Sequence, residues 1–565
     1  MSSTDNAESS TSVWGIDLGS TYSCISKVDE FGRAVVINNR DGDPVTPSVV
    51  MFVGPDDIQV GKEAKRQMQL DPDNVCELVK RHMGDPEWRF QAHGAEWTAP
   101  EVSAHILKAL CEDAELQTRE KVEKVVITVP AYFGIMEREA TIAAGKVAGL
   151  DVVDVVNEPT AAAMSYGFAQ GADVDETVLV YDLGGGTFDV TVIRLEPMDS
   201  GSHIKVVATG GNHRLGGVQW DERLVNLIVG KFMEAHSDAD DPLDDEIAAA
   251  ELRLASEDAK RGLTLRDSVS QIVVSGEVRD NVEVTRDAFE QATRELLDQT
   301  VEFTRDTVEK AKELGAGEID RVLLVGGSSF MPAVAERLAA EFPGWAPELE
   351  DANQAVAKGA ALLGFQAELR AKLSEEAEVA EARGEEASSE AIERKVAEEM
   401  GVGLDTLQRI KDTEVTNVCS RGFGVKLLRD GRDPGSNDPA DFMIDHVIAP
   451  NTPLPGEPPP ETYGTTVPNQ DIVRVELWQQ AGSELSEELA HNEKIGEGVI
   501  PLPGSDPVGA PINVTLAMAE NGVLNLKASH SSGADLEFEV EAEGAVMSQE
   551  QIAEAAERVA SMTRA

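Results

Sequence analysis

Short runs of β-branched and other apolar residues alternate with longer amphipathic stretches from residue 13 to about residue 364. The clearest runs are 125–129, 178–181 and 322–325. This alternation is typical of an α/β architecture in which the strands are buried on both faces. Helical spacing dominates between about residues 222 and 321, which predicts a helix-rich subdomain inserted into the α/β region.

The pattern changes again after residue 365. Residues 366–412 are rich in Glu and Ala with apolar positions at helical spacing, which predicts an acidic helical insertion or linker. Alternating strands such as 472–477 then predict an all-β sandwich over 413–545. Ser548 followed by Gln551 predicts the start of one short C-terminal helix within 546–565. Ahead of the α/β domain at 13–365, the small polar residues 1–12 predict a disordered tail.

The composition narrows the classes of partner. The chain of 565 residues carries 103 acidic and 49 basic residues, a formal net charge of −54. This charge argues against nucleic acid or an anionic membrane as the main partner. No apolar run approaches the ~20 residues of a membrane span, and the N-terminus lacks the features of a secretory signal. The four cysteines are widely spaced, which fits a reducing compartment, so we expect a cytoplasmic protein.

One phrase occurs twice in the α/β region, at residues 13–21 and 178–189. Each copy is an apolar strand that ends in Asp-Leu-Gly and continues into a turn of small residues with a hydroxyl. Glycines let backbone N–H groups approach phosphate oxygens, and an Asp at the strand end can hold Mg²⁺ through its waters. A single copy is better explained as an ordinary strand-to-hairpin turn, but the pair predicts two related halves that hold a polyphosphate between them. A third strand and Gly-Gly turn, at 324–329, offers bare backbone to a nucleoside.

These phrases, together with 129–133, 157–163 and 215–217, carry a family resemblance. The chain resembles the seventy-kilodalton heat-shock chaperones of the DnaK type, which belong to the actin and sugar-kinase superfamily. The resemblance covers 13–365 well and 413–562 more loosely. It implies a two-lobed actin-like ATPase domain that binds ATP or ADP with Mg²⁺ and hydrolyses ATP slowly. It also implies that the nucleotide modulates how the sandwich binds unfolded or extended polypeptide segments.

The resemblance assigns roles to individual residues. The residues expected to bind the nucleotide are Gly19, Ser20, Thr21, Tyr22, Gly184, Gly185, Gly186, Thr187, Gly216, Gly217, Glu257, Lys260, Arg261, Thr264, Gly326, Gly327, Ser328 and Phe330. Those expected to carry catalysis are Lys80, Glu158, Asp182, Thr187 and Asp189, with Asp182 and Asp189 as alternatives for polarising the attacking water. Asp17 and Asp182 are expected to hold the hydrated metal ion.

Two further sets come from the same resemblance. Pro130 and Arg138 match the pair that relays the nucleotide state to the second domain. Val425, Leu428 and Val473 match positions that line the peptide groove, although each could equally be an ordinary core residue of a sandwich.

The sequence also departs from the family pattern. Phe330 stands where Arg is usual, and Asp154 stands where a basic residue often serves J-domain cochaperones, which argues against that partner. A nucleotide-exchange factor remains an implied partner. The acidic insertion replaces the usual short Leu-rich linker, and no helical lid is expected beyond Met562.

Three functions follow from this reading. The leading hypothesis is an ATP-driven chaperone, and the alternative is a nucleotide-gated regulatory or binding module with one dedicated protein partner. A small-molecule kinase of the same superfamily is the third, and both the β-domain and the phrase at 157–160 argue against it.

Overall fold

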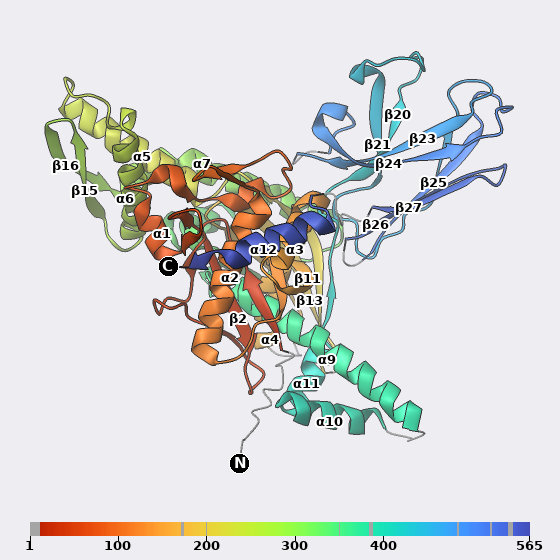
Figure 1. Ribbon diagram of the computed structural model, residues 1–565, viewed down its shortest axis with the longest axis horizontal. Helices are drawn as coiled ribbons and strands as arrows, with labels where there is room; N and C mark the ends of the chain where they lie inside the picture. Colours follow the sequence, from red (N-terminus) through yellow and green to blue (C-terminus); the bar gives the residue numbers. More distant parts are fainter. Residues whose placement is uncertain are drawn as a thin grey trace.

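The structure is a computed structural model that describes residues 12–170, 174–198, 200–349, 351–383, 388–482, 485–519, 522–540 and 546–564. Two α/β lobes form the body, a helical arm extends from one end, and a two-sheet β-domain extends from the other (Figure 1). The tail expected at 1–12 lies outside the described residues apart from Ser12.

The first lobe is built on a sheet with parallel strands at its centre. The strand order is β11 (Asp151–Asn157), β10 (Lys124–Val129), β1 (Val13–Asp17), β2 (Tyr22–Val28) and β3 (Ala34–Val36), with β4 (Thr46–Pro47) also paired to β2. β1 is parallel to β10 and antiparallel to β2. The side chains of β1 alternate between two cores: Trp14 and Ile16 pack in one and Val13 packs in the other. The elements of the first core include α2 (Ala99–Thr118) and α3 (Ile135–Val147).

A smaller subdomain rises from the first lobe beside the cleft. It contains β5 (Val50–Phe52), β6 (Asp57–Val60), α1 (Lys62–Gln67), β7 (Val75–Cys76), β8 (Phe90–Ala92) and β9 (Ala95–Trp97). A short 3₁₀ turn, η2 (Val79–His82), carries Lys80 at the base of this subdomain.

The second lobe repeats the plan of the first. Its strand order is β18 (Pro347–Leu349), β17 (Arg321–Val325), β12 (Glu176–Leu183), β13 (Phe188–Pro197), β14 (Ser202–Asn212) and β19 (Glu414–Thr416). β12 is parallel to β17 and antiparallel to β13, as β1 is to β10 and β2. Between the sheets, α4 (Glu158–Gln170) packs against α9 (Ala355–Arg383). A Cβ added at Gly359 would lie 1.6 Å from the Ala161 carbonyl oxygen, so only glycine allows this approach.

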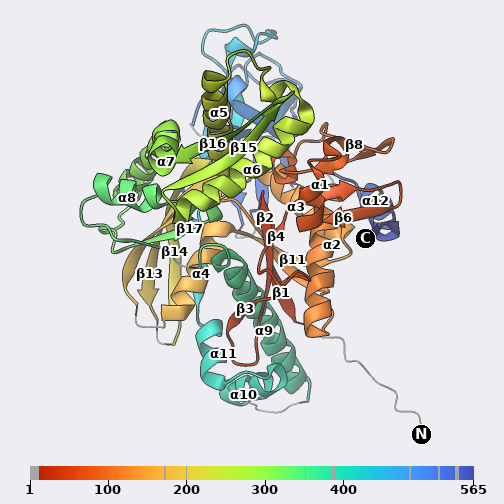
Figure 2. The same cartoon turned by 90° about the vertical axis from the view of Figure 1, so that its left-hand side faces the viewer.

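The helix-rich subdomain expected from the sequence belongs to the second lobe. It comprises α5 (Gly217–Ala235), α6 (Glu246–Leu265), the hairpin β15 (Ser268–Ser275) and β16 (Val278–Thr285), and α7 (Arg286–Glu313), with α8 (Pro332–Glu341) following β17. Figure 2 shows α5, α6 and the hairpin on the side of the molecule away from the helical arm.

The helical arm is continuous with the α/β body. Helix α9 runs through residue 366 without interruption, and α10 (Ser389–Met400) and α11 (Leu404–Lys411) return the chain. The amide Nε2 of Gln366 donates to the carbonyl oxygens of Ile410 and Thr413, each at 2.6 Å. The Arg409 guanidinium lies 4.0 Å from the centre of the Phe168 ring. These contacts hold the end of the arm where β19 pairs with β14 and forms the edge of the second-lobe sheet.

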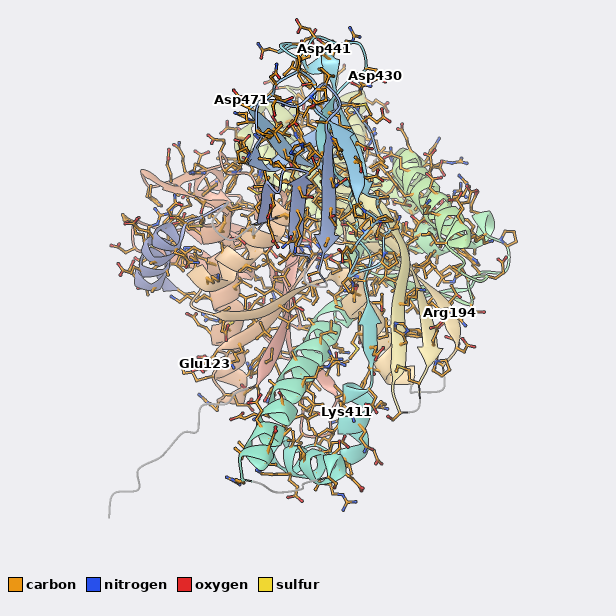
Figure 3. The ribbon with its side chains drawn as sticks, turned by 90° about the vertical axis from the view of Figure 1, so that its right-hand side faces the viewer. Glu123, Arg194, Lys411, Asp430, Asp441 and Asp471 are labelled. Atoms are coloured by element: carbon orange, nitrogen blue, oxygen red, sulfur yellow. The ribbon has the colours of Figure 1, made fainter. Side chains whose placement is uncertain are left out.

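The β-domain consists of two four-stranded antiparallel sheets. One has the order β21 (Phe442–Ile448), β20 (Phe423–Leu428), β23 (Ile472–Gln480) and β24 (Asn492–Pro501). The other has the order β22 (Glu461–Gly464), β25 (Pro511–Met518), β26 (Leu524–His530) and β27 (Asp535–Val540). Both sheets contribute alternate residues to one apolar core, for example Leu477 and Leu526. Figure 3 shows Asp430, Asp441 and Asp471 near the tip of this domain, at the opposite end of the molecule from Lys411.

The last helix packs on the first lobe rather than on the β-domain. Helix α12 (Gln549–Ser561) begins at Ser548, whose side chain forms the expected reciprocal capping pair with Gln551. Ile552 and Val559 join the core that α2 and α3 cover, and β28 (Thr563–Arg564) pairs in parallel with β6. The buried Arg564 guanidinium bonds Asp113 at 2.9 Å. The β-domain is therefore attached to the α/β body at both of its ends.

Within the described ranges, none of the helices combines the length and the apolar character needed to cross a membrane.

Candidate functional site

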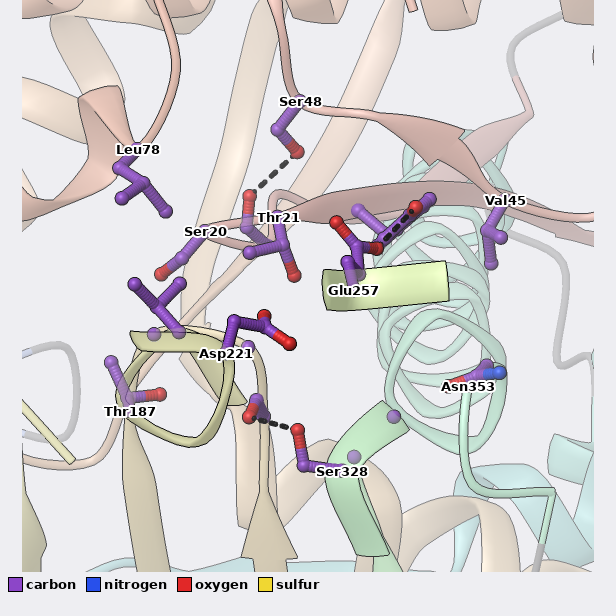
Figure 4. Close-up of a pocket in the computed structure, with 18 of the residues that line it drawn as sticks. Ser20, Thr21, Val45, Ser48, Leu78, Thr187, Asp221, Glu257, Ser328 and Asn353 are labelled. Atoms are coloured by element: carbon purple, nitrogen blue, oxygen red, sulfur yellow. Dashed lines mark hydrogen bonds between the residues drawn. The ribbon is translucent and has the colours of Figure 1, made fainter. Parts of the chain in front are cut away.

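A cleft of about 710 Å³ lies between the two lobes. Its walls come from the turns after β1 and β12, from η2, from α6 and from the turn after β17. Figure 4 shows the side chains of Ser20, Thr21, Thr187, Asp221, Glu257 and Ser328 around this common space. All of the nucleotide-binding residues expected from the sequence line the cleft except Gly216 and Gly217, which lie directly behind the lining glycines.

The two glycine turns meet at the floor of the cleft. A Cβ added at Gly185 would lie 2.0 Å from the Thr21 hydroxyl, and one added at Gly186 would lie 2.6 Å from the Ser20 Cβ. Side chains at these positions would force the turns apart, so glycine is required for the lobes to approach. A Cβ at Gly216 would likewise lie 2.6 Å from the Thr187 backbone nitrogen. The turns therefore present bare backbone and hydroxyl groups, the donors that suit phosphate oxygens.

An acidic group with one buried lysine lies beside these turns. The Lys80 ammonium bonds the Glu158 carboxylate at 2.5 Å, and the Lys80 side chain is only 5% exposed. Burial raises the pKa of Asp17 to about 7, with a further increase from Glu158, while Lys80 opposes the shift. Burial and Glu158 also hold the pKa of Asp182 well above its usual range. The site therefore has more carboxyl groups than Lys80 can keep ionised.

Asp189 adds a further buried carboxyl group to this site. It is 1% exposed, and burial, Glu158 and Asp182 hold its pKa well above the usual range. Neither oxygen of Asp189 has a hydrogen-bond partner of standard geometry among the described residues. Asp189 lies behind the cleft wall rather than in it, whereas Asp17 and Asp182 line the cleft.

This donor set fits a hydrated divalent cation. Buried carboxylates with unfavourable ionisation are stabilised by a nearby cation, and Mg²⁺ takes few protein ligands because it keeps most of its waters. In the part of the chain that the structure describes, no group of three or more His, Cys, Asp or Glu side chains is arranged to hold a metal ion. Asp17 and Asp182 can therefore contribute to a Mg²⁺ site that waters and phosphate oxygens complete.

The opposite end of the cleft is closed by a charged cluster across the lobes. Glu257 of α6 accepts hydrogen bonds from the Tyr22 hydroxyl at 2.8 Å and from the Lys65 ammonium of α1 at 2.5 Å. Burial alone would raise the pKa of Glu257, but Lys65 and Arg261 lower it to about 2. Glu257 is therefore ionised at neutral pH and holds α1 and α6 together over the cleft.

Lys260 and Thr264 of α6 both line the cleft, and Lys260 also bonds α5. The Lys260 ammonium bonds the Gly217 carbonyl oxygen at 3.0 Å and Asp221 at 2.8 Å. Thr264 donates to the Lys260 carbonyl oxygen at 3.3 Å. Phe330 is 42% exposed at the mouth of the cleft, where an aromatic face is open to a flat ring.

Sequence reasoning missed several cleft residues, namely Val45, Lys65, Arg81, Asp221, Leu254 and Asn353. Lys65 lies 192 residues from its partner Glu257, and Asp221 lies 39 residues from its partner Lys260. No local sequence pattern indicates that such distant residues form a pair. Their place in the cleft follows only from the folded structure.

The remaining predicted residues lie away from the cleft. Pro130 follows β10, and the Arg138 guanidinium donates to the Val155 carbonyl oxygen at 3.0 Å and to the Asn157 side chain. Arg138 lines a small pocket between the first lobe and the β-domain. Arg138 therefore lies at the boundary between the first lobe and the β-domain, and Pro130 begins the turn between β10 and α3.

The three expected groove residues are on β20 and β23. Val425 is 3% exposed and belongs to the core of the β-domain. Val473 is half-buried and packs against that core, and Leu428 is half-buried. Leu428 pairs with Phe442, and Val473 pairs with Ile500, near the tip of the domain. Only the latter two offer apolar surface to a ligand in this arrangement.

The family model for the Hsp70 protein matches residues 13–369. The chain belongs to the Hsp70 family. Three curated relatives, each named "Chaperone protein DnaK", are 41% identical over 367 residues, which is 63% of this chain. They come from Thermotoga petrophila, Thermotoga sp. strain RQ2 and Thermotoga maritima. The match spans 59% of the length of each relative. The residues that the family model matches form the α/β body and its cleft.

Proposed function

We propose that this protein is a Mg²⁺-dependent ATPase in which ATP binding and slow hydrolysis modulate the binding of extended polypeptide segments by the β-domain. The observation that carries the proposal is the cleft, where two glycine turns meet beside a buried Lys80–Glu158 pair and the carboxylates of Asp17 and Asp182. The three relatives named as chaperones support the second half of the proposal.

In this proposal the turns at 19–21 and 184–187 donate backbone and hydroxyl hydrogens to the β- and γ-phosphates. Mg²⁺, when bound near Asp17 and Asp182, would neutralise charge on those phosphates. Lys80 stabilises charge on the γ-phosphate and orients the attacking water, and Glu158 keeps the ammonium in place. Of the two candidates to polarise that water, Asp182 lines the cleft, whereas Asp189 lies behind its wall. Catalysis of this kind is mainly positioning and charge stabilisation.

The β-domain is proposed to bind segments in extended form, through main-chain hydrogen bonds and apolar pockets. Leu428 and Val473 are the groove residues with exposed apolar surface, and Val425 supports them from the core. We further propose a cytoplasmic location and a nucleotide-exchange factor as a second partner. We do not propose a J-domain cochaperone as a partner, because the negative charge of Asp154 would repel the acidic loop of such a cochaperone.

One observation favours the alternative, a nucleotide-gated module with one dedicated partner. The β-domain is attached at both ends, by β19 on β14 and by α12 on the first lobe. A domain fixed in this way is suited to a single partner of defined shape, because it has less freedom to adapt to many segments.

One experiment tests both versions. Release of inorganic phosphate from ATP is measured with the full chain and Mg²⁺, and binding of a panel of labelled apolar peptides is measured by fluorescence anisotropy with ATP and then ADP. Hydrolysis with nucleotide-dependent affinity for many peptides supports the chaperone. Hydrolysis without binding of any peptide supports the dedicated-partner version, and absence of ATP binding and hydrolysis refutes both.

A further inference from the structure

A buried arginine joins the β-domain to the first lobe. Arg421 lies between β19 and β20, and its side chain is 11% exposed. The guanidinium makes three contacts. Nε donates to the Tyr132 carbonyl oxygen at 2.7 Å, Nη1 to the Gln480 carbonyl oxygen at 3.3 Å, and Nη2 to the Glu137 carboxylate at 2.9 Å. Arg421 therefore holds its own domain with one nitrogen and the first lobe with the other two.

The segment that Arg421 holds in the first lobe is the turn between β10 and α3. A second contact fixes the same turn, because the Ile135 N–H donates to the Gln479 side chain at 3.3 Å. Space there is tight, since a Cβ added at Gly134 would lie 2.3 Å from the Gln479 amide nitrogen. The position of the turn thus depends directly on the position of the β-domain.

The other side of this turn faces the acidic end of the cleft. The Phe133 ring centre lies 5.7 Å from the Lys80 ammonium, and the Phe133 ring packs edge-on against Tyr132 at 5.7 Å. The Tyr132 side chain also interacts with the Thr187 side chain, which partly offsets the rise in the Tyr132 pKa caused by burial and Asp189. One turn therefore contacts Arg421 on one side and Lys80 and Thr187 on the other.

We propose that Arg421 is a positioning residue for ATP hydrolysis, which rests on the proposed ATPase function. By fixing Tyr132 and Glu137, Arg421 holds the Phe133 ring against Lys80 and the Tyr132 side chain beside Thr187. Loss of the guanidinium leaves the Tyr132 carbonyl oxygen and the Glu137 carboxylate without this partner in a buried interface, so the turn moves. Because small displacements of catalytic groups lower turnover more than they lower ground-state binding, kcat is affected before nucleotide affinity.

The test is made with the full-length protein. Arg421→Ala is expected to lower kcat for ATP about 5- to 10-fold, with the Kd for ATP unchanged within twofold. Arg421→Lys keeps the charge near Glu137 and is expected to recover part of the loss. Phe133→Leu lowers kcat through the same contact, so the double variant is expected to be no slower than about the slower single variant. Lys527→Ala, which removes an exposed β-domain ion pair with Glu537, is the matched control and leaves kcat unchanged.

The outcomes separate this inference from the function on which it rests. A wild-type protein that does not hydrolyse ATP overturns both. A wild-type protein that hydrolyses ATP while Arg421→Ala has normal kcat overturns only the role of Arg421. Fully additive effects of the two substitutions in the double variant also overturn the role of Arg421. Equal losses of kcat, nucleotide affinity and thermal stability in Arg421→Ala overturn it as well, because they indicate a general structural role.

Discussion

The nucleotide cleft and the β-domain differ in how their candidate binding residues are held. In the cleft, charged side chains are buried against each other, as in the Lys80–Glu158 pair, and glycines bring the backbone of one lobe against the other. In the β-domain, Leu428 and Val473 are half-buried apolar residues near the tip, supported by a sandwich core. A buried charged site tolerates little change in geometry, whereas an apolar groove tolerates changes of shape. Substitutions in the cleft are therefore expected to have larger effects than substitutions in the groove.

The largest effect is expected at Lys80. Lys80→Ala leaves Glu158 buried without its partner and removes the ammonium from the phosphate end of the cleft. We expect a loss of at least about 100-fold in kcat, with ATP affinity within a fewfold of wild type. Single-turnover phosphate release and equilibrium nucleotide binding measure the two quantities.

Lys62→Ala is the control, because Lys62 forms an exposed ion pair with Asp43 outside the cleft lining. Wild-type turnover in Lys80→Ala would contradict the role assigned to this lysine.

The next effect is a pH dependence of stability at Asp221. Burial raises the pKa of Asp221 to about 6, although Lys260 opposes the shift. Because the pKa is higher in the folded than in the unfolded protein, the stability contribution is present below about pH 4 and is lost as the pH rises through 6. Asp221→Asn removes this titration, so the wild type is expected to lose about 2 to 3 kcal/mol relative to the variant between pH 4 and 7.

Urea unfolding of both proteins at a series of pH values, followed by tryptophan emission, checks this. Trp220 is the neighbouring residue and is buried in the same lobe. Parallel curves for the two proteins would show that Asp221 titrates normally.

A smaller loss is expected where glycine is required for the lobes to meet. Gly185→Ala places a methyl group 2.0 Å from the Thr21 hydroxyl, so the two turns must separate. We expect ATP affinity to fall about 20-fold, measured by isothermal titration calorimetry. Gly230→Ala in α5 is the matched control, because no atom lies within 4 Å of its added Cβ. Equal affinities for the two variants would mean that the turns do not need to touch when nucleotide binds.

The smallest effect is expected in the β-domain. Val473→Asp places a charge on the proposed groove, and we expect apolar peptides to bind about 10-fold more weakly while basal ATP turnover stays normal. Ile472→Asp, at the adjacent exposed position on the opposite face of β23, is the control and should bind peptide normally. If both variants bind peptide equally well, the groove does not include Val473, and the comparison between the cleft and the groove is wrong.

The sequence was most informative where a site is made by a short continuous segment. The two Asp-Leu-Gly phrases predicted both turns of the cleft, and Ser548 with Gln551 predicted the start of α12. Each depends on residues a few positions apart, so the local chain carries the information. The same holds for the helix-rich region between α5 and α7, where the spacing of apolar residues is enough.

The remainder depends on contacts between distant residues. The pairing of β19 with β14, the Lys65–Glu257 bond and the docking of α12 on α2 and α3 join segments whose sequences give no sign of each other. The boundary expected at residue 365 falls inside α9, because helical spacing continues across it. Val425, whose family position suggests the groove, is a core residue because its place on β20 directs it inward.

The packing of α12 on the first lobe also affects the order in which the parts of the chain can finish folding during synthesis. Arg558 contacts Glu101, which precedes it by 457 positions, so the first lobe is made almost entirely before the helix that completes its surface exists. Until then the apolar side chains that receive Ile552 and Val559 remain open to solvent. Contacts of such long sequence separation form late and slowly. The first lobe is thus among the last parts of this chain to finish folding, and the β-domain must fold while the lobe beside it is still incomplete.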